Sequence, residues 1–138
     1  MQTTSDWARF LFISGIVFAS IVCVRDVSAA RKTPVEVWCG GDDGLTQRLR
    51  DGLEKAFESS PDFNLISGSK PRKLIVTIPT HVKWMKVEKR TLIDYTVEFT
   101  SANNHALGTF TGSCWDDEMT QCVAQIMGDA RGAARRIH

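Results

Sequence analysis

Thiols, histidines, paired carboxylates and clustered amines are the groups in this sequence that could carry chemistry. Cys39 is followed by the glycine pair 40–41 and then by a stretch that predicts the start of a helix. A helix amino terminus can activate a thiol, so Cys39 is the best candidate nucleophile. It has no neighbouring histidine and no C-x-x-C partner, and we predict no catalytic residue. The histidines show no metal-ligand spacing and are expected to be exposed polar residues: His81, His105 and His138.

Two Asp-Asp pairs, Asp42-Asp43 and Asp116-Asp117, could bind Ca²⁺ or act as acid and base if they met in the fold. Each pair directly precedes an expected helix, where a carboxylate can accept hydrogen bonds from the first backbone amides. Capping of the two helices explains the pairs with fewer assumptions. We therefore predict no metal site and no cofactor.

The two Asp pairs lie in similar eight-residue segments. Residues 42–49, DDGLTQRL, align without gaps to residues 116–123, DDEMTQCV, and a cysteine shortly precedes each segment. Either a strand-to-helix unit was duplicated, or two helix starts met the same capping requirement with similar residues. Eight positions are too few to establish a repeat, so we take the second explanation.

A basic segment in the middle of the chain is the candidate binding site. It contains Trp84 and is crowded with basic residues, namely Lys70, Arg72, Lys73, Lys83, Lys86, Lys89 and Arg90. We assign to the site Lys83, Trp84, Lys86, Lys89 and Arg90. Such a surface could hold an anionic glycan, a lipid headgroup or an acidic protein. The alternative is a solvated strand whose charges protect the edge of a sheet from unwanted pairing.

The amino-terminal segment predicts a secretory signal peptide. Residues 10–24 carry no formal charge, and the small residues Ala29 and Ala30 follow them closely. A permanent membrane anchor would need roughly 20 apolar residues. Arg25 and Asp26 end the run before that length, so we expect the segment to be cleaved.

Cleavage of residues 1–30 would leave a single domain, residues 31–138, in the periplasm or secreted, without a permanent membrane span. Val22 stands where a lipid-modification site needs a small residue, so we expect Cys23 to leave with the signal. The whole chain has a formal net charge of +1, which does not favour nucleic acid as a partner.

Three cysteines would remain after cleavage, and an oxidising compartment favours a disulfide between two of them. Sequence alone allows three pairings of Cys39, Cys114 and Cys122. We favour Cys114–Cys122, because the two residues are close in the chain, and place Cys39–Cys114 next. Closing so short a loop stabilises a fold by roughly 2.5 kcal/mol.

The spacing of apolar residues predicts an α+β domain. Strands are expected at residues 35–38, 74–78, 92–101 and 106–114, and amphipathic helices at about 43–59 and from 116 or 117 onward. Residues 63–66 are expected to be briefly extended, residues 86–90 to turn, and pairing after Pro79 to resume at Val82 and Trp84 beyond a bulge. The order β-α-β-β-β-α implies a two-layer sandwich, in which a mixed four-stranded sheet carries both helices on one face.

The stretch after the first expected strand resembles a known kind of envelope domain. Residues 44–49, GLTQRL, and 53–66, LEKAFESSPDFNLI, follow one another as in the amino-terminal α/β domain of the bacterial TolB proteins and in related domains such as the curli secretion component CsgG. The resemblance implies a periplasmic location and partner binding. The chain lacks the β-propeller repeats and the pore-forming segment of those proteins.

These features together predict an exported periplasmic, noncatalytic binding or envelope-assembly module, whose partner is an envelope protein or an anionic glycan. The alternative, from a different class, is a small secreted enzyme or inhibitor. That protein would use Cys39 or the pairs Asp42-Asp43 and Asp116-Asp117.

Overall fold

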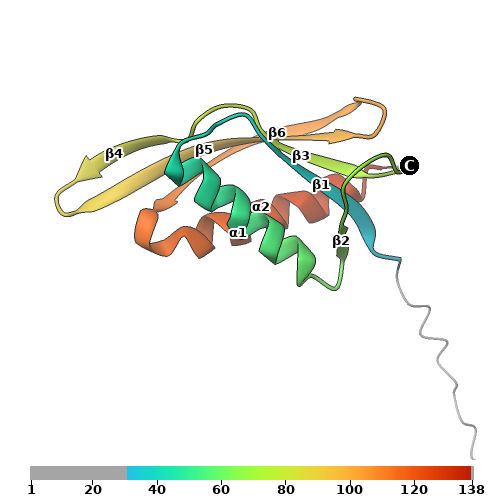
Figure 1. Ribbon diagram of the computed structural model, residues 1–138, viewed down its shortest axis with the longest axis horizontal. Coiled ribbons are helices and arrows are strands. Elements are labelled where there is room, and N and C mark those ends of the chain that lie inside the picture. Colours follow the sequence, from blue (N-terminus) through green and yellow to red (C-terminus); the bar gives the residue numbers. More distant parts are fainter. Residues whose placement is uncertain (1–30, 138) are drawn as a thin grey trace, which may run out of the picture.

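The computed structural model describes residues 31–137, which form one sheet with two helices on one of its faces (Figure 1). The elements are, in order, β1 (Thr33–Cys39), α1 (Gly44–Glu58), β2 (Phe63–Leu65), β3 (Leu74–Ile78), β4 (Lys83–Val87), β5 (Arg90–Ser101), β6 (Ala106–Trp115), the 3₁₀ turn η1 (Asp116–Glu118) and α2 (Met119–Ala134). The α+β class, the mixed sheet and the two-layer arrangement are confirmed. The expected signal peptide lies outside the described residues, and within them no helix is long and apolar enough to cross a membrane.

The sheet has six strands, not the four that we expected. β1 pairs in parallel with β2 and β3, whereas β5 pairs antiparallel with β3, β4 and β6. The two additional strands are β2, only three residues long, and β4, whose five residues are all exposed. Neither shows the alternation of apolar and polar residues that marks a half-buried strand, because β2 is too short and β4 buries neither of its faces.

The strands β3 and β4 follow one another along the same edge of β5, and a bulge separates them as predicted. Residues 78–82 lie opposite only residues 95–97 of β5. Pro79 has no amide hydrogen to donate, so pairing stops there and resumes at Lys83. Gly40 packs against this bulge, where an added Cβ would lie 2.3 Å from the carbonyl oxygen of Pro79.

The core lies between the sheet and the two helices. α1 contributes the buried residues Leu49, Leu53 and Phe57, which recur at helical spacing on one face. α2 contributes Ile126 and Ala130 in the same way. They belong to one cluster with alternating residues of β3 and β5, namely Leu74, Val76, Ile78, Ile93, Tyr95, Val97 and Phe99. Alternation along β5 therefore defines a helix side and an open side of the sheet.

The two helices run in the same direction, so both helix starts lie toward the end of the molecule that carries the β4–β5 turn (Figure 1). Near the start of α1, Arg48 donates to the backbone carbonyl of Asp116 at 3.1 Å. Past the end of α1, Asp62 pairs with Arg131 in the last turn of α2 at 2.9 Å. We call the end of the molecule that carries the β4–β5 turn and both helix starts the hairpin end.

Candidate functional site

The candidate binding residues form an exposed β-hairpin at the edge of the sheet. β4 pairs with β5 with Trp84 opposite Ile93, and the two-residue turn 88–89 joins the strands. Among the described residues β4 has no second partner strand, so its outer edge is free for pairing. The hairpin can therefore contact a partner through its backbone as well as its side chains.

The side chains of β4 alternate between the two faces of the hairpin. Trp84 lies opposite buried Ile93 and therefore projects on the helix side, together with Lys86. The remaining residues of the strand, Lys83, Met85 and Val87, project on the open side. The exposed fraction is 60% for Trp84, 52% for Met85 and 40% for Val87, which are three of the four exposed large apolar residues in the described part of the chain.

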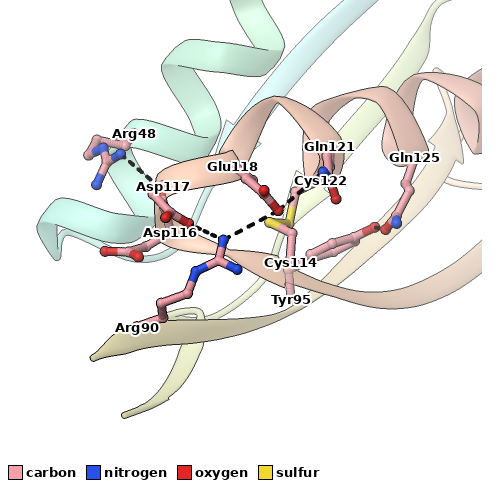
Figure 2. Close-up of a disulfide and its surroundings, with 10 residues drawn as sticks. All are labelled: Arg48, Arg90, Tyr95, Cys114, Asp116, Asp117, Glu118, Gln121, Cys122 and Gln125. Carbon is pink, nitrogen blue, oxygen red and sulfur yellow. Dashed lines mark hydrogen bonds and ion pairs between the residues drawn. A yellow bond between two sulfur atoms is a disulfide. The ribbon is translucent and has the colours of Figure 1, made fainter. Parts of the chain in front are cut away.

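Arg90 has a different role from the three lysines of the site. Its guanidinium lies 2.6 Å from a carboxylate oxygen of Asp117 and 3.4 Å from one of Glu118 (Figure 2). It also lies over the ring of Trp115, 4.4 Å from the ring centroid. The hydrogen bond between Arg90 and Asp117 raises the pKa of the arginine and lowers the pKa of the aspartate. Arg90, which lies next to the turn of the hairpin, thus ties the hairpin to the start of α2, while Lys83 and the other lysines point to solvent.

The Cys114–Cys122 disulfide, the pairing that the sequence analysis favours, joins the end of β6 to the first turn of α2 (Figure 2). Both cysteines are buried in the core. One turn further along α2, the hydroxyl of Tyr95 donates to the side-chain oxygen of Gln125 at 2.8 Å. Burial raises the pKa of Tyr95. The start of α2 is therefore fixed to the sheet by a covalent bond and by a side-chain hydrogen bond.

The prediction that Asp116 or Asp117 caps α2 is wrong. Residues Asp116–Glu118 form a 3₁₀ turn, and neither this turn nor α2 receives a side-chain cap. The carboxylate of Asp117 faces Arg90, and Asp116 accepts from Arg48 through its backbone carbonyl (Figure 2). Contacts with the sheet and with α1 hold this helix start in place of a cap.

Asp43 caps α1 as expected, and it also holds the loop that leads into β4. Its carboxylate accepts from the amides of Leu45 at 3.1 Å and Thr46 at 3.0 Å, and from the hydroxyl of Thr46. His81 Nδ1 lies 2.6 Å from the same carboxylate, and the amide of Val82 donates to the Thr46 hydroxyl at 2.9 Å. The hydroxyl of Thr46, more than His81, holds the pKa of Asp43 well below its usual range.

The sequence analysis missed this link between α1 and the loop before β4. We expected His81 to be an isolated polar residue, because its partner Asp43 is 38 positions away. The sequence contains one signal for this link, because Thr46 is a polar residue on the helix face that continues through the apolar residues Leu49 and Leu53. In the structure Thr46 is fully buried. A buried hydroxyl on such a face requires a hydrogen-bond partner.

Cys39 and Asp42 are two of the groups that the alternative enzyme would use, and each has one described contact. Cys39 is a free, half-buried thiol that donates to the carbonyl of Gly41 at 3.2 Å. Asp42 is almost fully exposed and lies 3.7 Å from His81. Within residues 31–137, no three His, Cys, Asp or Glu side chains are grouped so that they could hold a metal ion.

No family model and no curated protein matches the chain. Among solved structures, protein XCC0632 from Xanthomonas campestris, described under family DUF330, is similar with 10% identity and a TM-score of 0.56, over 75% of this chain and 86% of that one. This likeness shows a shared fold.

Two further solved structures are similar at lower scores. A minor lipoprotein from Acinetobacter baumannii is 10% identical over 72% of this chain and 92% of its own, with a TM-score of 0.41. The hypothetical protein CT253 from Chlamydia trachomatis is 10% identical over 62% and 73%, with a TM-score of 0.37. Scores this low carry no argument about function. None of the three is described as a TolB or CsgG protein, so that resemblance stays an expectation from the sequence.

Proposed function

We propose that this protein is an exported, noncatalytic binding module of the bacterial envelope. It holds an acidic, extended segment of a partner protein along the outer edge of β4. The observation that carries the proposal is the composition of β4, an edge strand that exposes large apolar side chains between lysines.

The apolar side chains distinguish a binding strand from a merely protected edge. An edge that only needs protection from unwanted pairing carries charges and little exposed apolar surface. β4 carries lysines, but Trp84, Met85 and Val87 stand among them and leave 40% to 60% of their surface exposed. Exposed apolar patches mark interaction sites, and aromatic side chains are the commonest anchors at protein interfaces.

The mode of binding follows from the free edge and the charge. An extended peptide can add to an exposed strand through backbone hydrogen bonds, while side chains on alternate faces select its sequence. Lys83, Lys86 and Lys89 lie on or beside this edge, with Glu88 as the one carboxylate of the turn. Their charge favours a segment rich in Asp and Glu. Arg90 is left out of the proposed surface because Asp117 already holds it.

Export is supported by two features that are independent of β4. Residues 1–30 have the composition of a signal peptide. The Cys114–Cys122 bond belongs to a class of crosslink that persists in oxidising compartments and is rare in the cytosol.

Charge reversal of the three lysines tests the binding surface. We expect the Lys83→Glu, Lys86→Glu, Lys89→Glu variant to lose partner recovery from envelope extracts while its thermal midpoint stays nearly unchanged, because exposed charges contribute little to folding. Crosslinks from Lys86 in the wild type should map to an acidic segment of the recovered protein. Recovery that survives the triple reversal would show that β4 is only a protected edge.

The matched control is Arg72→Glu, Arg135→Glu, Arg136→Glu, which changes the net charge by the same amount at the other end of the molecule. It should retain the partner. Trp84→Ala leaves the charge unchanged and should still weaken recovery, because it removes the aromatic contact. A captured partner that resists protease digestion would be a glycan and would contradict the assignment to a protein.

A further inference from the structure

Four segments that are distant in sequence meet at the end of the molecule opposite the β4–β5 turn. They are the chain before β1, the loop before β3, the β5–β6 turn and the end of α2 (Figure 1). The amide of Thr33 donates to the backbone carbonyl of Asp62 at 2.9 Å, and the side chain of Asp62 pairs with Arg131 of α2. Arg72 from the loop and Arg136 from the turn after α2 line a common hollow with the β5–β6 turn.

These segments supply a group of exposed cations that we call the basic end. Six of its members form no ion pair with a carboxylate of the described residues, namely Arg31, Lys32, Lys70, Arg72, Arg135 and Arg136. Two carboxylates on or beside these segments already have partners, because Arg131 holds Asp62 and Lys73 holds Glu36. The cations of the basic end therefore outnumber the carboxylates that could neutralise them.

Arginines from different elements line two hollows at the basic end. One hollow, of about 280 Å³, is lined by Arg31, Arg131 and Arg135 and also by Asp62, whose carboxylate Arg131 holds. The other, of about 410 Å³, lies between Arg72 and Arg136. A guanidinium donates two parallel hydrogen bonds to phosphate oxygens, so each hollow suits a phosphate group.

The helix dipole explains only part of this surface. Cations near the carboxyl end of a helix are favoured by its exposed carbonyls, which accounts for Arg135 and Arg136 directly after α2. Arg31 and Lys32 precede β1, and Arg72 precedes β3, so these residues belong to no helix. Six like charges at one end repel one another in the absence of a ligand. The placement of these six cations at one end of the molecule is explained if the surface binds an anion.

We propose that the basic end binds the phosphate headgroups of anionic phospholipids, so that the domain rests with this end on a membrane surface. A bilayer fits better than a small soluble phosphate compound, because the cations are exposed and spread over two hollows. The expected signal, with its uncharged residues 10–24, also joins the domain at Arg31, so this end is next to the membrane during export. Polybasic surfaces beside membrane-inserted segments are attracted to anionic lipid. The basic end is separate from the β4 hairpin, and the two proposals stand independently.

Sedimentation with lipid vesicles tests the proposal on the exported protein as it is recovered from cells. Binding is expected to vesicles of phosphatidylcholine with phosphatidylglycerol, and not to phosphatidylcholine alone, and it should weaken at high salt. Each cation near an anionic surface contributes about fivefold to the partition coefficient. The variant Arg72→Glu, Arg135→Glu, Arg136→Glu should therefore lower it by at least about a hundredfold.

The variant Lys83→Glu, Lys86→Glu, Lys89→Glu is the matched control, since it changes the net charge equally at the hairpin end. It should keep its affinity for the vesicles, and an equal loss in both variants would overturn the proposal by showing an effect of overall charge. If the triple arginine variant fails to fold, Arg72→Glu alone should still lower partitioning by about fivefold or more.

Inorganic phosphate distinguishes a lipid headgroup from a soluble phosphate ligand. Added at matched ionic strength, it should release the protein from vesicles no better than chloride does. Specific release by phosphate, together with a rise in the thermal midpoint in its presence, would overturn the membrane assignment in favour of a soluble ligand. The membrane assignment would also be overturned by vesicle binding that does not depend on phosphatidylglycerol. It would likewise be overturned if the protein recovered an acidic protein partner that the triple arginine variant alone failed to recover.

Discussion

The two helix starts have similar sequences but are held by different interactions. At the start of α1, the carboxylate of Asp43 accepts hydrogen bonds from the first amides of the helix. At the start of α2, Asp117 points to Arg90 on the sheet, and a disulfide between Cys114 and Cys122 fixes the first turn. The motif specifies which groups are present, but the neighbouring elements decide what those groups bind.

The two helix starts hold the β4 hairpin at its two ends, the α1 start at its base and the α2 start next to its turn. Asp43 and Thr46 hold Val82, the residue directly before β4. Asp117 holds Arg90, the first residue of β5 after the turn. The proposed binding strand is therefore exposed along its length, while the residue before β4 and the residue after the β4–β5 turn are each attached to a helix start. Partner binding to β4 can use a strand that is already positioned.

Breaking the covalent contact at the start of α2 should have the largest effect on stability. We expect the Cys114→Ala, Cys122→Ala variant to unfold with a free energy lower by about 2.5 kcal/mol, because the short loop is no longer closed in the unfolded chain. Urea denaturation measures the difference, and reduction of the wild-type protein should reproduce it.

Cys39→Ser is the matched control at the other helix start. The thiol is free, and a serine hydroxyl can still donate to the carbonyl of Gly41, so the change should be within about 0.5 kcal/mol. Equal losses for the two variants would show that Cys39 takes part in the crosslink and that the pairing is wrong.

Removal of the cap at the start of α1 should have the next largest effect. We expect Asp43→Ala to cost about 2 kcal/mol, toward the upper end for a cap. The reason is that Asp43 accepts from two amides and also from Thr46, which is fully buried and holds Val82 in turn. Urea denaturation followed by circular dichroism measures this loss.

The charge of Asp43 should also give the α1 start a dependence on pH. Contacts with Thr46 and His81 lower its pKa in the folded protein below the usual value of 3.8. The charge therefore contributes stability that is present above the unfolded pKa and is lost as the pH falls through the lower, folded pKa. Asp43→Asn keeps an acceptor oxygen without the charge, so its difference from wild type should shrink below about pH 4. Glu36 and Asp117 also have lowered pKa values, but they are present in both proteins. A difference that stays constant down to about pH 3 would contradict this account.

The elements that bury an apolar face could be predicted from the sequence. The run Leu-Ile-Val-Thr-Ile of β3, the spacing of Leu49, Leu53 and Phe57 in α1 and the β5–β6 hairpin all follow from burial against one core. The bulge after β3 could also be predicted, because Pro79 cannot donate to a strand. The prediction of a four-stranded sheet was wrong in part because β4 buries none of its side chains. Its sequence therefore shows no regular alternation of apolar and polar residues.

The contacts between distant residues could not be predicted in the same way. Arg90 has the same charge as Lys83 and Lys86, and only the fold shows that Asp117, 27 residues away, holds it. The basic end was missed for a related reason. Its cations come from segments that are distant in the sequence, and in the sequence Lys70 and Arg72 belong with the basic central segment and not with Arg31 or Arg136.

The smallest effect is expected for Asp116→Ala, which removes a carboxylate of the Asp pair at the other helix start. The stability should change by no more than about 0.5 kcal/mol, because the Asp116 side chain caps no helix and the carbonyl that receives Arg48 belongs to the backbone, which alanine keeps. Each variant removes one carboxylate from an Asp pair that precedes a helix, so the difference between them compares an aspartate that caps its helix with one that caps none. Urea denaturation of both proteins under one set of conditions gives that difference directly. If Asp116→Ala costs as much as Asp43→Ala, then Asp116 caps α2 in solution, and the similarity between the two segments extends to their structure.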